Sequence, residues 1–129
     1  MLAELGAEVV GIERIAEFAE RARAALVAAG YGDVEVHVGD GTLGLPDRAP
    51  FDTIAVAAAA PRPPAALVAQ LAPAGRLVVP VGSRRDQRLE VVVRTERGAE
   101  VVRSVPCRFV PLVGAEGFDE SGSGQSSRL

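Results

Sequence analysis

Alternation between short apolar runs and a helical apolar stripe is the feature that most constrains the fold of this chain. Residues 9–13 have the apolar content of a buried strand and end in the acid Glu13. In residues 14–29, apolar side chains recur three and four positions apart, which predicts an amphipathic helix that Gly30 is suited to end. A second strand is expected at residues 34–38. Strand, helix and strand in this order predict a parallel pair joined by a crossover helix.

The same alternation continues after a loop at residues 39–50 that is rich in glycine, aspartate and proline. Three prolines favour the first turn of a short helix that starts near Pro61, runs to about Leu71 and is closed by Gly75. Further strands are expected at residues 51–57, 76–81, 89–95 and 99–105, with the last two forming an antiparallel hairpin. The predicted fold class is α/β, a largely parallel sheet with a C-terminal antiparallel hairpin.

Composition narrows the function classes. A length of 129 residues with 48% apolar residues suits a single domain, expected over residues 1–118, followed by a Ser/Gly-rich tail at residues 119–129 that is expected to be disordered. The net charge of −3 and the absence of a basic, aromatic-rich stripe argue against nucleic acid as a partner. No apolar run approaches the ~20 residues that cross a bilayer, and no secretory signal pattern follows Met1. A cytoplasmic location and no membrane partner are therefore expected.

Few side chains are suited to acid–base, nucleophilic or metal chemistry. The chain has one cysteine, Cys107, and one histidine, His37, so an internal disulfide and a Cys/His zinc site are both excluded. His37 lies in the apolar alternation "VEVHV" and is interpreted as an incidental strand residue. Cys107 is interpreted as a half-buried thiol, because no activating base is evident. The basic loop with Arg84, Arg85 and Arg88 is interpreted as solvated. No catalytic residue and no metal ligand is predicted.

Two strand ends carry candidate ligand-binding residues, because ligands of doubly wound sheets bind at the carboxyl ends of the strands. Glu13 could accept hydrogen bonds from both ribose hydroxyls of a nucleoside, or it could be an acid that stabilises the start of the following helix. Asp40 could accept from an adenine amino group while Gly41 lets the base approach the backbone, or the pair could form a plain Asp-Gly turn. Small side chains at residues 57–60 leave space above the sheet or simply fill an alanine-rich chain.

Four segments in this order resemble one family: "VVGIER", "VHVGDGTLGLPDRAPFDTIAVAAAAP", "LVAQLAPAGRLVVPVG" and "RFVPLVGAEGF". The set resembles the protein-L-isoaspartate (D-aspartate) O-methyltransferases over about residues 2–118. The resemblance implies a Rossmann-like methyltransferase fold with S-adenosylmethionine as cofactor. It also implies that Glu13 holds the ribose and that Asp40 and Gly41 line the adenine pocket. The implied reaction is protein repair, a methyl transfer to the α-carboxylate of L-isoaspartyl residues in damaged proteins and peptides.

The same resemblance implies a further N-terminal region with the acceptor-binding serine or threonine, the first strand and a glycine-rich cofactor loop. No G-x-G-x-G segment precedes Glu13. We therefore expect the later part of a methyltransferase, with the first strand and its helix largely missing, two inner strand edges unpaired and no activity of this chain alone. The alternatives are a non-catalytic domain fragment and a small nucleoside-binding module that uses Glu13 and Asp40 without methyl transfer.

Overall fold

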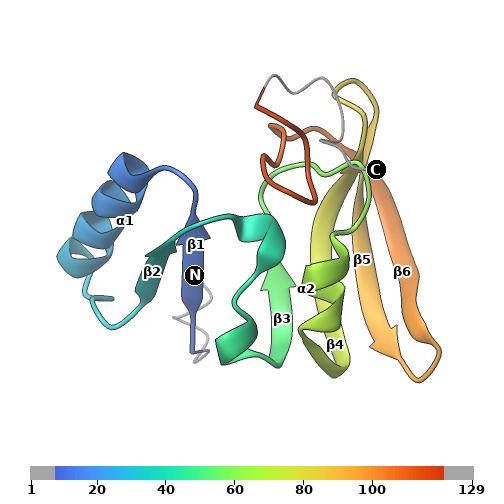
Figure 1. The fold of residues 1–129 in the computed structure, drawn as a ribbon, viewed down its shortest axis with the longest axis horizontal. Helices are drawn as coiled ribbons and strands as arrows, with labels where there is room; N and C mark the ends of the chain where they lie inside the picture. Colours follow the sequence, from blue (N-terminus) through green and yellow to red (C-terminus); the bar gives the residue numbers. More distant parts are fainter. Residues whose placement is uncertain (1–7, 121–129) are drawn as a thin grey trace. The chain divides into compact units, whose positions relative to one another are not determined.

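The computed structural model describes residues 8–120. The chain divides into two units, Met1–Gly41 and Thr42–Leu129, and Figure 1 shows the elements of each. The domain predicted over residues 1–118 spans both units. The tail expected to be disordered lies almost entirely outside the described residues, since only Asp119 and Glu120 of it are described.

The first unit is the predicted strand–helix–strand segment. Strand β1 (Val10–Glu13) pairs in parallel with β2 (Glu35–Val38), and helix α1 (Ala16–Ala28) connects them. Ala19 on α1 is fully buried, and the Arg23 side chain bonds the helix to β2 through Nε and the Val36 carbonyl oxygen at 3.1 Å. The predicted elements are confirmed, with bounds that differ by one or two residues.

The second unit is built on one four-stranded sheet. Its strands are β3 (Phe51–Ala55), β4 (Leu71–Gly82), β5 (Gln87–Thr95) and β6 (Gly98–Cys107), in the order β3-β4-β5-β6. Strand β3 runs parallel to β4, whereas β4, β5 and β6 form antiparallel pairs. Two single-turn 3₁₀ helices, Gly41–Leu43 and Pro46–Arg48, precede β3. The predicted hairpin is therefore present and extends the sheet.

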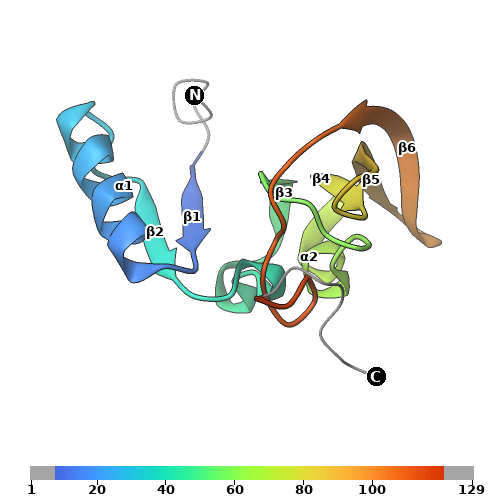
Figure 2. The same cartoon turned by 90° about the horizontal axis from the view of Figure 1, so that it is seen from above.

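The core of this unit lies between the sheet and helix α2 (Ala65–Ala69), which Figure 2 shows against β4. It consists of the buried side chains Leu67, Leu71, Leu77, Val79 and Val92. Each such side chain contributes roughly 1.5–3 kcal/mol through the removal of apolar surface from water. Leu71, Leu77 and Val79 belong to β4, so this strand supplies most of the core.

The prediction was wrong about where α2 ends and β4 begins. We expected the helix to reach about Leu71 and β4 to start at residue 76, but β4 already pairs at Leu71 with Phe51. The register then jumps to Thr53 opposite Arg76, so the residues before Arg76 form a bulge, with φ +63° at Ala74. Gly75 is needed inside this bulge, because a Cβ there would lie 2.7 Å from the Ala72 carbonyl oxygen.

The described residues form two separate sheets, and β1 and β3 each pair with only one strand among them. The sequence predicts these two open edges.

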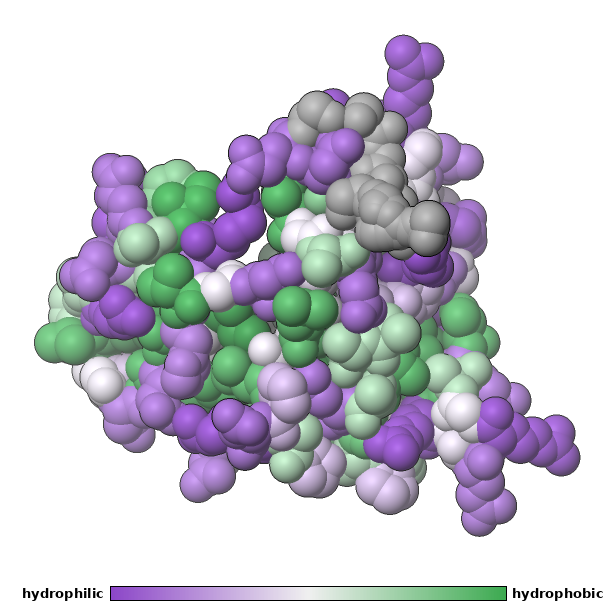
Figure 3. All heavy atoms as spheres, viewed as in Figure 1, coloured by the Kyte–Doolittle hydropathy of each residue, from purple (hydrophilic) through white to green (hydrophobic). Residues whose placement is uncertain are grey.

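Strand β3 is also less buried than its composition suggests, since Asp52, Thr53 and Ala55 are exposed. Apolar side chains reach the surface of the face drawn in Figure 3, and the exposed apolar residues of the chain include Phe18, Val27, Val102 and Val110.

Candidate functional site

The parallel register of β1 and β2 brings two candidate acids to one sheet edge. Glu13, the last residue of β1, is opposite Val38, the last residue of β2. The Gly39 amide donates to the Glu13 carbonyl oxygen at 3.0 Å, so the pairing continues one residue past β2. Asp40 follows at once. Both acids therefore lie at the carboxyl edge of the pair, where α/β sheets bind ligands.

Glu13 makes one hydrogen bond that bears on its role. Its Oε1 accepts from the Ile15 amide at 3.2 Å, immediately before α1. This contact lies at the start of α1, where the sequence analysis placed one of the two possible roles of Glu13. A carboxylate has two oxygens with about four acceptor sites in all, and Glu13 is only half-buried. The bond to Ile15 is therefore compatible with further donors such as ribose hydroxyls.

Gly41 has no steric or conformational reason of its own to be glycine. The glycines with positive φ in the described residues are Gly30, Gly44, Gly82 and Gly98. A Cβ on Gly41 would meet no described atom within 4 Å. The structure therefore excludes only a turn that depends on a left-handed glycine at this position. Open space beside this backbone is compatible with a flat base lying against it.

The loop after Gly41 belongs to the second unit. It is held by residues that the sequence analysis did not single out. The buried Gln70 side chain accepts from the Leu45 amide and donates to the Leu43 carbonyl, both at 2.9 Å. The fully buried Thr42 hydroxyl accepts from the Glu116 amide at 3.1 Å. These contacts join segments 27 and 74 residues apart, so no local sequence signal could have revealed them.

The described residues hold no group of three or more side chains suited to a metal ion. His37 is half-buried in β2, and its Nε2 has no hydrogen-bond partner in the described part of the chain. Cys107 is a free, half-buried thiol at the end of β6. None of the described helices is long and apolar enough to cross a membrane.

Comparisons with known proteins agree on one family. The family model for Protein-L-isoaspartate(D-aspartate) O-methyltransferase (PCMT) matches residues 1–117. The protein-L-isoaspartate O-methyltransferase of Aeropyrum pernix is 50% identical over 125 residues, which cover 93% of this chain and 48% of that protein. The enzyme of that name from Hyperthermus butylicus is 54% identical over 114 residues, covering 87% and 47%. The chain thus spans about half the length of these relatives.

Solved structures give the same result for the fold. A protein-L-isoaspartate O-methyltransferase superposes with a TM-score of 0.76 at 26% identity, over 84% of this chain and 35% of the other. A putative enzyme of that kind from Plasmodium falciparum, solved in complex with S-adenosyl-L-homocysteine, gives a TM-score of 0.70 at 21% identity, over 87% and 55%. With a family model matched over nearly its whole length, the chain belongs to the protein-L-isoaspartate(D-aspartate) O-methyltransferase family.

Proposed function

We propose that this chain supplies the adenosine-binding edge of an enzyme that transfers a methyl group from S-adenosylmethionine to L-isoaspartyl residues of damaged proteins and peptides. The observation that carries the proposal is the β1–β2 register, which places Glu13 and Asp40 at one sheet edge. The family match and the S-adenosyl-L-homocysteine in a structural relative support the choice of cofactor. We also propose a cytoplasmic location, in keeping with one cysteine in 129 residues.

The residues present fit the adenosine part of this cofactor. Glu13 offers carboxylate oxygens to the two ribose hydroxyls, and hydrogen bonds to a charged group contribute roughly 1.5–3 kcal/mol. Asp40 would accept from the adenine amino group. The space beside Gly41 lets the base lie close to the backbone. These three residues would therefore set the affinity and the orientation of the adenosine.

The proposed chemistry requires alignment more than proton transfer. The cofactor supplies an electrophilic methyl group on a sulfonium. The accepting carboxylate is already ionised at neutral pH, so the protein needs no general base to activate it. Correct orientation of bound reactants can supply about 7–11 kcal/mol of such a barrier. A site made of binding residues, without a catalytic dyad in the described part of the chain, is consistent with this requirement.

Two measurements test the proposal. Calorimetry with S-adenosyl-L-homocysteine measures cofactor binding, and transfer of labelled methyl groups to an isoaspartyl peptide, with the aspartyl peptide as control, measures activity. Activity is assayed on a version extended to the length of the curated relatives. Binding with methylation of the isoaspartyl peptide alone supports the proposal. Binding without any methylation would favour the nucleoside-binding module, and the absence of both would favour the non-catalytic fragment.

A further inference from the structure

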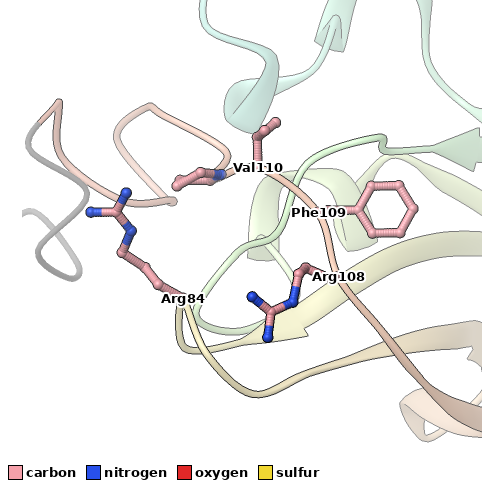
Figure 4. Close-up of a pocket in the computed structure, with 5 residues that line it drawn as sticks. Arg84, Arg108, Phe109 and Val110 are labelled. Atoms are coloured by element: carbon pink, nitrogen blue, oxygen red, sulfur yellow. The ribbon is translucent and has the colours of Figure 1, made fainter.

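The second unit contains a solvent-open pocket of about 340 Å³ whose residues come from two segments distant in sequence. Arg84 lies in the turn between β4 and β5, whereas the segment after β6 contributes Arg108, Phe109, Val110 and Pro111. Figure 4 shows Arg108 pointing from that segment toward the β4–β5 turn, with Arg84 rising from the turn. The pocket is therefore lined by two arginines and three apolar residues, with the Arg84 side chain extending away from Arg108 and the Phe109 ring pointing away from both (Figure 4).

The segment that carries Arg108 is held by a buried amide. Gln87 is 4% exposed, and its side chain forms two hydrogen bonds with the backbone of Phe109. Its Oε1 accepts from the Phe109 amide at 2.7 Å, and its Nε2 donates to the Phe109 carbonyl oxygen at 3.1 Å. Ala59 adds two further bonds, to the Val110 carbonyl and the Leu112 amide, both at 2.7 Å. Hydrogen bonds from Gln87 and Ala59 therefore hold the segment after β6 that lines the pocket.

The turn that carries Arg84 is equally constrained. The Ser83 hydroxyl accepts from the amides of Arg85 and Asp86 at 3.2 and 3.1 Å, and the Ser83 amide donates to the Asp86 carbonyl oxygen at 3.0 Å. Gly82 has φ +141°, and a Cβ there would lie 2.1 Å from the Asp86 carbonyl oxygen. The backbone below Arg84 is therefore ordered before any ligand arrives, which lowers the entropy cost of binding.

The pocket lies at the edge of the sheet where α/β proteins bind ligands. Ala60, just beyond β3, donates to the Pro80 carbonyl and accepts from the Gly82 amide, both at 2.9 Å. The segment after β6 that lines the pocket forms hydrogen bonds with Ala59. The pocket therefore adjoins the carboxyl ends of the parallel strands β3 and β4, the usual position of ligands in such sheets.

The residues that line the pocket include two arginines and no acid. The β4–β5 turn contains Arg84 and Arg85 against Asp86, and Arg108 is the only charged residue between Val105 and Ala115. Arg84 also takes part in another interaction, so Arg108 is the better probe. Guanidinium groups match the geometry of carboxylates and remain charged at every physiological pH. An anionic group beside an apolar one is the chemistry that this pocket fits.

We propose that Arg108, in the pocket that Arg84 also lines, binds an acidic side chain near the damaged residue of the polypeptide substrate and so forms a subsite. The subsite would make the protein prefer isoaspartyl segments that carry glutamate or aspartate as neighbours. This proposal rests on the proposed function, because only a polypeptide acceptor would bring such a side chain to the pocket. Both arginines are exposed to water, and exposed ion pairs contribute up to about 1 kcal/mol, which corresponds to a preference of roughly fivefold.

Fluorescence anisotropy with labelled peptides tests the subsite without requiring methyl transfer. One peptide carries two glutamates after the isoaspartyl residue, a second carries two glutamines, and a third carries two lysines. The wild-type chain should bind the glutamate peptide roughly fivefold more tightly than the glutamine peptide. Arg108→Gln should remove this preference, and Arg108→Glu should reverse it toward the lysine peptide. Arg103→Gln, at an exposed arginine of β6 outside the pocket, is the matched control and should keep it.

Equal affinities of the wild type for the glutamate and glutamine peptides would overturn the subsite, as would an equal loss in Arg103→Gln or no detectable binding of any peptide. An unchanged preference at ~1 M salt, where the Debye length is about 3 Å, would also contradict an ionic contact. Cofactor titration distinguishes the two proposals. An Arg108-dependent preference in a version extended to the length of the curated relatives that binds no S-adenosyl-L-homocysteine would keep the subsite and reject the proposed methyl transfer.

Discussion

The side-chain amide of Gln70 occupies the place where a side chain on Gly44 would have to lie. A Cβ on Gly44 would be 2.2 Å from Gln70 Oε1, and Gly44 has φ +63°. The same amide bonds the residues on either side of this glycine, Leu43 and Leu45. One glutamine thus closes the loop, and a larger residue in place of Gly44 would have to displace the Gln70 amide.

Gly44→Ala should destabilise the chain. A left-handed conformation costs a non-glycine residue about 1–2 kcal/mol, and the clash with Gln70 adds to that cost. The unfolding midpoint in urea should fall with little change in the slope of the transition. Gly39→Ala, at a glycine without positive φ and with no described atom within 4 Å of a Cβ, is the control and should change the midpoint little. Equal midpoints for the two variants would contradict this account of Gly44.

Gln70→Ala and Gly44→Ala should not be additive. Gln70→Ala alone leaves the Leu45 amide and the Leu43 carbonyl without their partner, and each such hydrogen bond contributes about 0.5–1.5 kcal/mol. It also removes the atom with which a methyl group on residue 44 would clash. The double variant should therefore be more stable than the sum of the two losses predicts. Urea titration of the four chains measures this coupling, and strict additivity would show that the two sites are independent.

The sequence predicted the elements and the strand ends because those features are local. Periodicity identified β1, α1 and β2, and the position of an acid at the end of β1 identified Glu13 as a candidate ligand-binding residue. The start of β4 was missed because Leu71 was expected to end the preceding helix and Gly75 to close it, and only pairing with Phe51 makes Leu71 a strand residue. Tertiary contacts overrode local propensity at this point.

The loops that Gln70 and Gln87 hold in the second unit could not have been predicted either, but the reason is different. Gln70 and Gln87 each bond a backbone more than twenty residues away, and nothing in the sequence distinguishes a glutamine that does so from a solvated one. The pocket with Arg84 and Arg108 exists because β5 and β6 return the chain to the end of β4. The interpretation of the basic loop with Arg84 as solvated stays a prediction, because the peptide titration substitutes Arg108 and not Arg84.

Gly41→Val should impair cofactor binding without destabilising the fold. No described atom lies within 4 Å of the added Cβ, and the backbone of residue 41 is not left-handed. The valine would instead fill the space proposed for the adenine. Calorimetric titration with S-adenosyl-L-homocysteine should show weakened binding while the urea midpoint stays close to that of the wild type. An unchanged dissociation constant would remove Gly41 from the proposed adenine pocket.

Glu13→Ala should weaken cofactor binding by about one to two decades, in a version extended to the length of the curated relatives. The reason is the loss of a charged acceptor for two ribose hydroxyls, whose hydrogen bonds contribute roughly 1.5–3 kcal/mol. The variant also loses the contact from Oε1 to the Ile15 amide, so its stability is measured beside its affinity. Glu17→Ala, at an exposed acid of α1 that pairs with Arg21, is the control and should leave the affinity unchanged. A Glu13→Ala variant that is less stable but binds with wild-type affinity would assign Glu13 to the start of α1 alone.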